Sequence, residues 1–388
     1  MLTCCVAVSY VRVSSNRMPM WTLRLDSGPR RVNHAAAAVN HLIFSFGGYC
    51  TGDDYSRRRP IDVHVFNTVS LKWKKLPEVE KHDPSFRCVP FMRYGHSAIA
   101  YNDNIYIFGG RNDPDGACNE LYCFQTSTFK WCLPKPSGDI PPARDGHSVC
   151  LIKNKMYVFG GYEDESQCFS NSVHKLNIDK MRWKKLECKG RPAHWRDFHS
   201  AVTIGQYMYI FGGRSDLNGP VFTNMEFYSN ELAVFDTKNK TWTQPAISRN
   251  RPIGRRSHSA FVYKDNMYIF GGYNRVTNQH FDTIHKFDTK AMEWSKVKVQ
   301  GVLKPCQRRR QCCVMMDSKL IMFGGTSPTS KSTSIDHLQD MDDLYILDFE
   351  PSLKTLCQLV VIENNLDTYL LPRELRIEIT NMISSNSL

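Results

Sequence analysis

The hydrophobic pattern along most of the chain is that of short buried β-strands that recur at a regular spacing. Six apolar and aromatic runs, FSFGGY, YIFGGR, YVFGGY, YIFGGR, YIFGGY and IMFGGT, each end in a glycine pair, and the pairs begin at Gly47, Gly109, Gly160, Gly212, Gly271 and Gly324. Two adjacent glycines let the backbone leave a buried strand sharply at little steric cost. A period near 50 residues predicts a repeat architecture.

Each repeat contains the pattern of four strands. About a dozen residues before most glycine pairs, another apolar run opens with His-Ser or a close variant, as in GHSAIA and SHSAFV. An alternating run such as ELAVFD follows each pair, and five repeats then carry a tryptophan, at Trp73, Trp131, Trp183, Trp242 and Trp294. One small sheet cannot bury both faces, whereas six arranged radially cover each other and protect their edges. We therefore expect an all-β, six-bladed β-propeller.

The sixth repeat lacks its last strand, because the chain turns to Pro351 after LYILDF without another tryptophan. Near the N-terminus, MWTLRL carries Trp21 but has no repeat of its own. We expect the strand from Trp21 to Leu25 to complete the last blade, so that both ends of the chain close the ring. The predicted domains are an extension without a fold at 1–17, the propeller at 18–349 and a helical segment at 350–388.

Composition narrows the class of protein. The content of 41% hydrophobic and 23% charged residues is ordinary for a globular chain. Fourteen cysteines without an even framework of spacings indicate reduced thiols and hence the cytosol or the nucleus. No basic residue precedes the apolar N-terminal run, and no run of about 18 apolar residues occurs, so neither a signal peptide nor a membrane span is expected.

One face of the predicted ring gathers basic and aromatic residues. In an antiparallel blade, the turn before the first strand and the residues after the second lie at the same edge. The turns before the His-Ser positions carry arginines in what we take as equivalent places: Arg31, Arg93, Arg144, Arg196, Arg255 and Arg309. Arg111 and Arg214 follow two glycine pairs, and Tyr49, Tyr162 and Tyr273 follow three others. The sequence thus predicts a basic, aromatic mouth.

Two interpretations of these residues stay open. Arginine and histidine at repeated positions often hydrogen-bond to neighbouring loops, and this interpretation is favoured for the histidines, one per blade. As a set, however, so many arginines around one axis would repel each other unless an anion entered. Asp145 and Asp197 interrupt the ring, and more acids follow one glycine pair, at Glu163, Asp164 and Glu165. A ligand with an anionic end and a nearby cationic side chain would match this mouth.

Catalysis has little support in the sequence. There is no nucleophile elbow, no His-Glu-x-x-His, no Cys-x-x-Cys and no phosphate-binding glycine loop. Repeat symmetry also explains the histidines better than a metal site does, so we expect no enzyme, no cofactor and no metal. Net charge +12 would suit nucleic acid, and a nuclear protein that binds chromatin or nucleic acid through the basic face is the alternative. A narrow funnel at the axis of the ring fits the end of a polypeptide chain better than it fits a nucleic-acid duplex.

The C-terminal segment has helical periodicity instead. Leu353, Leu356, Cys357, Val360 and Val361 fall on one helical face, with Ser352 placed as the N-cap. A second helix starts in LPRELRIEITNMI, with Pro372 in its first turn and an apolar side formed by Leu375, Ile379, Met382 and Ile383. Both helices could pack on the propeller, but a closed ring has no edge that needs a cover. We expect apolar surface to remain for a partner.

These features resemble a known family. The repeats over residues 20 to about 349 resemble kelch repeats, and Ser352-Leu353 with Cys357 and Val361 resembles the BC box that binds elongin B and elongin C. Leu371-Pro372 with Leu375 resembles the adjoining cullin-2 box. In this order, the motifs resemble those of kelch substrate receptors of cullin-2 RING ubiquitin ligases. The resemblance implies a non-catalytic adaptor that docks on the elongins through Leu353, Cys357 and Val361, and on cullin-2 with its RING subunit through Leu371, Pro372 and Leu375.

The same resemblance implies that the mouth binds C-terminal degrons, often ending in glycine. In that family, an arginine after a glycine pair and a turn residue of the next blade hold the terminal carboxylate. The matching positions are Arg214 and Arg256, with Ser257 beside it, although relatives carry a small hydroxyl where this chain has Arg256. Asp145 and Asp197 in the funnel would favour a Lys or Arg shortly before the terminus. The predicted degron-binding residues are Arg93, Arg111, Arg144, Asp145, Tyr162, Arg196, Asp197, Arg214, Arg256, Ser257 and Tyr273.

Overall fold

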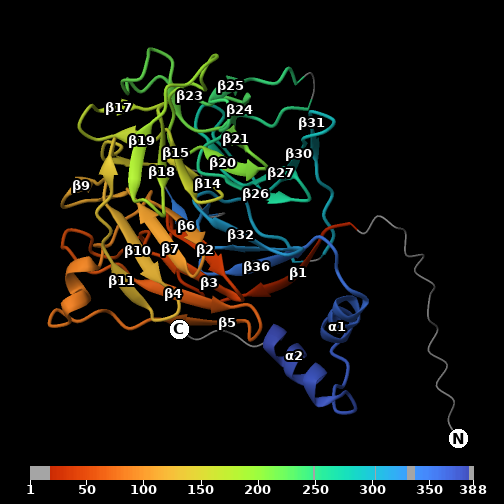
Figure 1. The fold of residues 1–388 in the computed structure, drawn as a ribbon. Coiled ribbons are helices and arrows are strands. Elements are labelled where there is room, and N and C mark those ends of the chain that lie inside the picture. Colours follow the sequence, from red (N-terminus) through yellow and green to blue (C-terminus); the bar gives the residue numbers. More distant parts are fainter. Residues whose placement is uncertain (1–17, 248–249, 302, 330–336, 384–388) are drawn as a thin grey trace, which may run out of the picture.

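The structure, a computed structural model, describes residues 18–247, 250–301, 303–329 and 337–383. It contains six sheets of four antiparallel strands around one axis, the third extended by one short strand (Figure 1). The innermost strands of neighbouring sheets contact each other all the way round. The expected six-bladed, all-β propeller is thereby confirmed, whereas the predicted N-terminal extension at 1–17 lies outside the described residues.

The first three blades follow each other along the chain. Blade 1 consists of β2 (Ala35–Val39), β3 (Leu42–Phe46), β4 (Val63–Asn67) and β5 (Lys72–Lys75). Blade 2 consists of β6 (Ser97–Tyr101), β7 (Asn104–Phe108), β10 (Leu121–Gln125) and β11 (Lys130–Cys132). Blade 3 consists of β14 (Ser148–Ile152), β15 (Lys155–Phe159), β18 (Val173–Asn177) and β19 (Arg182–Lys185), with β12 (Ser137–Gly138) parallel to β19. A 3₁₀ turn, Pro84–Cys88, precedes blade 2.

The other three blades complete the ring. Blade 4 consists of β20 (Ser200–Ile204), β21 (Tyr207–Phe211), β24 (Leu232–Asp236) and β25 (Thr241–Thr243). Blade 5 consists of β26 (Ser259–Tyr263), β27 (Asn266–Phe270), β30 (Ile284–Asp288) and β31 (Glu293–Lys296). Blade 6 consists of β32 (Cys312–Met316), β33 (Lys319–Phe323), β36 (Leu344–Asp348) and β1 (Met20–Leu25). As predicted, β1 pairs antiparallel with β36, from Met20 opposite Asp348 to Leu25 opposite Leu344.

Short strands follow five of the glycine pairs, at the face of the ring where the predicted mouth lies. They pair as small hairpins: β8 (Arg111–Asn112) with β9 (Gly116–Ala117), β22 (Ser215–Asp216) with β23 (Glu226–Phe227), β28 (Tyr273–Asn274) with β29 (Gln279–His280), and β34 (Thr326–Pro328) with β35 (Leu338–Asp340). In blade 3, β16 (Tyr162–Glu163) pairs with both β13 (Arg144–Asp145) and β17 (Cys168–Phe169). These loops build the rim of the mouth.

The blades are fastened to each other by a repeated aromatic contact. Each blade's tryptophan packs on the phenylalanine that precedes the glycine pair of the neighbouring blade, with ring centroids 5.0–6.2 Å apart. The pairs are Trp73–Phe323, Trp131–Phe46, Trp183–Phe108, Trp242–Phe159, Trp294–Phe211 and Trp21–Phe270. All twelve rings are buried, so the tryptophans are packing residues between blades.

A ring of backbone hydrogen bonds joins all six blades at the axis. It consists of the residues just before the His positions, called the axial ring below: Asn33, Gly95, Gly146, Phe198, Ser257 and Arg310. Each N–H donates to the carbonyl of the ring residue in the preceding blade, over 2.7–3.2 Å. All six have a positive φ, between 47° and 67°. Four are not glycine, so the left-handed backbone is held by the ring as a whole.

The glycine pairs form a second set of links between blades. The second glycine of each pair donates its N–H to the carbonyl of an arginine in the next blade, over 2.8–2.9 Å. A Cβ on Gly110, for example, would lie 2.6 Å from His96 Cβ, and φ there is 83°. Only glycine can pass this closely with such a backbone, which explains why the pair recurs in every repeat.

The C-terminal segment forms two helices beside blade 6, α1 (Leu353–Glu363) and α2 (Arg373–Ile383) (Figure 1). Ser352 caps α1 as predicted, because its hydroxyl accepts a hydrogen bond from Thr355 N. Pro372 stands just before α2, and its carbonyl accepts from Arg376 N. Lys354 of α1 pairs with Glu378 of α2 over 2.7 Å.

The main contact of the two helices with the propeller is made by α2. It contacts β1, its Ile379 is buried, and Met382 packs on the core between blades 6 and 1. Several apolar residues of the segment are left more than half exposed, among them Leu353 (71%), Tyr369 (77%) and Leu370 (91%). No helix among the described residues is long and apolar enough to span a membrane. All twelve cysteines in the described part are free thiols, as expected.

The inter-blade tryptophans give a first test of the fold. Trp242→Ala should lower the free energy of unfolding by about 3–5 kcal/mol, because it leaves a cavity against Phe159 and Phe235. Urea-induced unfolding followed by circular dichroism would measure the change. The matched control is Phe227→Ala on an exposed rim loop, for which we expect a loss of less than about 1 kcal/mol. Equal losses in the two variants would contradict the role given to the tryptophans.

Candidate functional site

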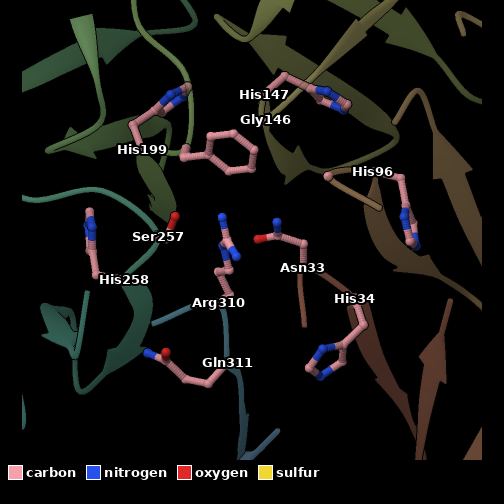
Figure 2. Close-up of a pocket in the computed structure, with 12 residues that line it drawn as sticks. Asn33, His34, His96, Gly146, His147, His199, Ser257, His258, Arg310 and Gln311 are labelled. Atoms are coloured by element: carbon pink, nitrogen blue, oxygen red, sulfur yellow. The ribbon is translucent and has the colours of Figure 1, made fainter. Parts of the chain in front are cut away.

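The axis of the propeller carries a polar cavity of about 130 Å³, lined by the axial ring and by the residues that follow it. Figure 2 shows the side chains of Arg310 and Asn33 extending into the middle of the space that the histidines surround. Arg310 Nη1 donates to the hydroxyl of Tyr49, which follows the glycine pair of blade 1, over 2.6 Å. These two side chains therefore narrow the axial cavity and form the floor of the mouth.

The histidines around this cavity link neighbouring blades. Nε2 of His147, His199 and His258 lies 2.7–2.9 Å from a serine hydroxyl of the preceding blade, and Nε2 of His96 lies 3.1 Å from Phe46 O. Burial, reinforced by a nearby arginine, lowers the pKa of His147 to about 3, so the ring is neutral at physiological pH. No group of described residues could hold a metal ion.

Five of the arginines lie inside the blades as clamps. Each donates from Nη1 to the carbonyl of the first glycine of its own blade's pair, over 2.6–3.2 Å, and from Nε to the carbonyl two residues before it. They are at most 4% exposed: Arg93, Arg144, Arg196, Arg255 and Arg308. In blade 1, Arg31 pairs with Asp62 instead.

This arrangement corrects two sequence-based expectations. Arg93, Arg144 and Arg196 do not line the mouth, because they are buried and their Nε and Nη1 groups donate to backbone carbonyls, while Arg144 Nη2 pairs with Glu163. The clamp of blade 6 is Arg308 and not Arg309, because Gln311 takes the place of the histidine and sets the register of RRRQC. Arg309 and Arg310 are thereby free for another role.

One half of the mouth is cationic. Arg256, Arg309 and Arg310, called the arginine triad below, come from the turns that open blades 5 and 6. The ring of Tyr273 lies below two of them, 4.4 Å from Arg309 Cζ and 6.0 Å from Arg256 Cζ. Burial, with Arg310 and Arg256 next to it, lowers the pKa of Arg309 to about 10. Among the described residues, none of the three forms an ion pair with a carboxylate, and Arg309 Nε is buried without a partner.

The other half of the mouth combines acids with paired arginines. Asp197 is fully buried and makes a two-point contact with Arg214, 3.1 Å from Nε to Oδ1 and a second, shorter contact to Oδ2. The Arg214 guanidinium also lies between Phe169 and Phe222, 5.3 and 5.1 Å from their centroids. Burial raises the pKa of Asp197 against the opposing effect of Arg214, and the two-point geometry keeps this an ion pair.

Asp145 is the acid of this half that has only a long ion pair. Its side chain is 6% exposed, and the nearest paired cation, Arg111 Nη1, stands 3.9 Å away and also 3.9 Å from Asp164 by its other terminal nitrogen. A Cβ on Gly95 would lie 3.3 Å from Asp145 Oδ2, so the carboxylate stands beside the axial ring at a position without a side chain. Burial, with a contribution from Asp197, raises the pKa of Asp145 to about 7.

The structure thus brings most predicted site residues to the mouth but divides them into two halves. Arg111, Asp145, Tyr162, Asp197 and Arg214 lie in the acidic half, where Tyr162 donates to Gln167 over 3.2 Å. Arg256 and Ser257 lie in the cationic half, and Tyr273 is buried beneath it. Sequence reasoning missed Arg310. The signal for it was three consecutive arginines in blade 6, where the other blades need only one.

The raised pKa of Asp145 leads to a test by pH. Because the folded state holds this proton more tightly than the unfolded chain does, stability is gained below the ordinary pKa near 4 and lost as pH rises through about 7. Asp145→Asn should therefore raise the melting temperature, relative to the unmodified protein, by a few degrees more at pH 8 than at pH 5. Thermal unfolding followed by circular dichroism would measure it.

The control for this test is Asp288→Asn. Backbone N–H groups, Ala291 N first among them, lower the pKa of Asp288 to about 2, so its titration lies below the tested range. Its effect on the melting temperature should be the same at pH 5 and pH 8. An effect of Asp145→Asn that did not change with pH would contradict the raised pKa.

Comparison with known proteins agrees with the fold. The family model described as the KLHDC2/KLHL20/DRC7 Kelch-repeats domain matches residues 95–325, more than half of the chain, and the Kelch motif matches residues 30–80. The chain is 50% identical to Kelch domain-containing protein 3 of Homo sapiens over 374 residues, which cover 96% of this chain and 98% of that protein. The protein of that name from Bos taurus is 50% identical over 377 residues, with the same coverage.

A more distant similarity covers a smaller share of the chain. Host cell factor 2 of Homo sapiens is 31% identical over 254 residues, which cover 62% of this chain and 31% of that protein. The glycine pairs, the inter-blade tryptophans and the family matches agree with each other. The chain therefore belongs to the kelch-repeat proteins and, among them, to the family of Kelch domain-containing protein 3.

Proposed function

We propose that the protein is a non-catalytic substrate receptor of a cullin-2 RING ubiquitin ligase, acting in the cytosol or the nucleus. Its mouth binds the C-terminal end of a substrate protein, and its two C-terminal helices dock on elongin B, elongin C and cullin-2. The observation that carries this proposal is the charge separation in the mouth. Among the described residues, arginines without a carboxylate ion pair occupy one half, and a buried acid whose paired cation stands 3.9 Å away occupies the other.

A free chain end matches such a mouth. Its carboxylate can accept two or three charge-assisted hydrogen bonds of about 1.5–3 kcal/mol each, a large part of the roughly 8 kcal/mol of micromolar binding. An internal segment brings no such charge and would leave the arginines desolvated and unpaired. A Lys or Arg shortly before the end would match Asp145. The resemblance noted above adds glycine as the expected last residue, which suits a floor narrowed by Arg310 and Asn33.

The tail supports the second half of the proposal. Leu353 and Cys357 are exposed and Val361 is half-buried, on a capped helix whose apolar face the propeller leaves open. Pro372 is exposed, and Leu371 and Leu375 are half-buried, where the linker enters α2. These are the positions that resemble the BC box and the cullin-2 box. A soluble protein exposes such a row of apolar residues at a cost unless a partner covers it.

The nucleic-acid alternative loses support from the same geometry. Four of the six arginines expected to form its basic face, Arg93, Arg144, Arg196 and Arg255, are buried clamps, and carboxylates occupy half of the mouth. A nucleic-acid duplex bound at the mouth would place its phosphates next to the carboxylates of Asp145 and Asp197, and these like charges would repel each other.

The proposed binding of a chain end is tested with one peptide, prepared once with a free C-terminus and once with an amidated C-terminus. A ten-residue peptide ending in Lys-Gly with a free terminus should bind at least about 30-fold tighter than its amidated twin, because the amide lacks the charge that the arginines accept. Fluorescence anisotropy at 150 mM salt would give both dissociation constants. Equal affinities would rule out recognition of a chain end. Tight binding of an unrelated DNA duplex instead, with a steep dependence on salt, would favour the nucleic-acid alternative.

The docking half is tested by co-purification. Leu353→Ala combined with Cys357→Ala should abolish the capture of co-expressed elongin B and elongin C, because both changes remove exposed apolar contacts on α1. Glu363→Ala, at the end of the same helix, is the control and should leave capture intact. Retained capture by the double variant would exclude this face as the docking site.

A further inference from the structure

Four lysines gather between blades 3 and 4, toward the side of the ring that faces away from the mouth. They are called the lysine cluster below: Lys155 of β15, Lys175 of β18, Lys184 of β19 and Lys240 of the turn between β24 and β25. Lys155 begins β15, whereas the glycine pair of the blade follows the other end of that strand. The turn with Lys240 likewise follows the end of β24 that lies opposite the start of β21. The cluster is thus separate from the mouth.

The side chains of the cluster point to the same groove. Tyr157 and Val173, two residues from Lys155 and from Lys175, pack in the core between blades 3 and 4. Because side chains two residues apart in a strand share a face, both lysines face blade 4. Lys184 lies directly opposite Lys175 in the sheet and therefore shares that face. The fourth lysine belongs to blade 4 itself, so the four ammonium groups meet over the groove between the two blades.

The cluster has charge without a counter-ion. Lys155 and Lys175 are half-buried, and the other two lysines are exposed. Burial lowers the pKa of Lys175, and the other three lysines of the cluster lower it further. In the described part of the chain, the lysines that form ion pairs are Lys75, Lys264, Lys286 and Lys354. The four ammonium groups of the cluster therefore repel each other until an anion arrives.

Comparison of the blades shows that Lys175 is unusual for its position. Four blades have an apolar residue at the equivalent place in the third strand: Val65, Cys123, Val234 and Ile346. Blade 5 has Lys286 there, but its ammonium pairs with Asp288 over 2.9 Å. Blade 3 has Asn177 where blade 5 has Asp288. Lys175 thus stands at a position that is otherwise apolar or neutralised.

Protection of sheet edges does not explain the cluster. Lysines on the outermost strand of a sheet prevent it from pairing with another chain, and β5, β19 and β31 all carry such lysines. This accounts for Lys184. Lys155 and Lys175 belong to β15 and β18, however, and each of these strands is already paired on both sides. Their charge therefore calls for a different explanation.

The groove beside the cluster has room for a ligand. Its volume is about 760 Å³, and Lys184 and Lys240 line it from neighbouring blades, with Lys185 as a further cation. Asp139 and Glu187 line it as well. The Asp139 carboxylate is already engaged, because its Oδ2 accepts a hydrogen bond from Lys185 N over 3.1 Å. The groove thus joins the exposed lysines of the cluster to a space larger than a single ion needs.

A small anion that carries several phosphate groups matches this arrangement. Lysine binds phosphate as a compact charge with three hydrogen-bond donors. A polyphosphate brings three or more negative charges to one place, whereas an acidic peptide spreads single charges along its chain. A nucleic-acid duplex would contact the exposed Lys184 and Lys240 from outside, and the half-buried Lys155 and Lys175 would stay without a counter-ion.

We propose that the lysine cluster binds a soluble polyphosphate anion at a site independent of the mouth. The anion neutralises the four ammonium groups and links blade 3 to blade 4, because Lys240 comes from the second of these blades. This site goes beyond the proposed function and does not depend on it. Inorganic triphosphate and inositol hexakisphosphate are the probes, since they carry the same phosphate groups on a linear chain and on a ring.

The first test is isothermal titration calorimetry with inorganic triphosphate on the full chain at 150 mM salt. Lys175→Gln and Lys240→Gln should each weaken binding at least about fivefold, because each removes one charge-assisted contact. The matched control is Lys286→Gln, the same substitution at the equivalent position of blade 5, which should leave the affinity within about twofold because its lysine is already paired. Equal affinities of Lys175→Gln and Lys286→Gln would overturn the proposal.

A second measurement locates the anion, because the arginine triad in the mouth also attracts phosphate groups. Lysines are acetylated with an N-hydroxysuccinimide ester, and the rate at each position is read by peptide mass spectrometry. Saturating triphosphate should slow acetylation of Lys155 and Lys175 at least about threefold, because a bound anion covers the ammonium groups and favours their protonated form. The rate at Lys286 should not change.

The same labelling experiment distinguishes the sources of the phosphate. Protection of Lys155 and Lys175 by either polyphosphate supports the proposal, and the probe that protects at the lower concentration shows whether a chain or a ring is preferred. Protection by a DNA duplex and by neither polyphosphate would overturn it, as would unchanged rates with both probes. The preference for a free peptide end is measured separately, so the proposed function stands or falls without this result.

Discussion

The closed ring of six backbone hydrogen bonds at the axis is the constraint on which the rest of the structure depends. Each bond requires its donor residue to take a left-handed backbone, which four non-glycine residues adopt at a cost of about 1 kcal/mol or more each. That cost is tolerable because the ring closes on itself, and hydrogen bonds in a closed chain polarise each other. The tryptophan contacts farther out hold the blades at the spacing that lets it close.

The ring also decides where side chains of adjacent residues point. Within one turn, the clamp arginine is buried in its own blade, the next residue forms a bridge at the rim, and the ring residue faces the axis. Three consecutive arginines in blade 6 therefore serve three different purposes. Blades 2 and 3 place glycine in the ring and hydrogen-bonding or acidic residues at the rim, which yields the opposite half of the mouth. The charge on each side of the mouth is therefore set by the residues at two positions of each turn, the rim position and the axial-ring position, while the backbone stays the same.

The features of this structure that could be predicted from the sequence are those set by local properties of the chain. The glycine pairs, the His-Ser strands, the closure by Trp21 to Leu25 and the cap at Ser352 follow from backbone geometry or burial at each residue, and the structure confirms them. The roles of the arginines do not follow in this way. A difference of one position separates a buried clamp from a mouth residue, and Gln311 in place of histidine hides the register in blade 6. The contact of α2 with β1 joins segments about 350 residues apart, so no local pattern could predict it.

The strand β1 that seals blade 6 is also the surface on which α2 rests, through Ile379 and Met382. Among the described strands, β1 comes before all the others in the chain, yet its partner β36 comes after the rest of the propeller. Until that pairing occurs, α2 has no platform, and the tail that follows β36 cannot take its final position. Completion of the ring and final placement of the helices are thus one event, which ties the position of the C-terminal helices to the integrity of the propeller.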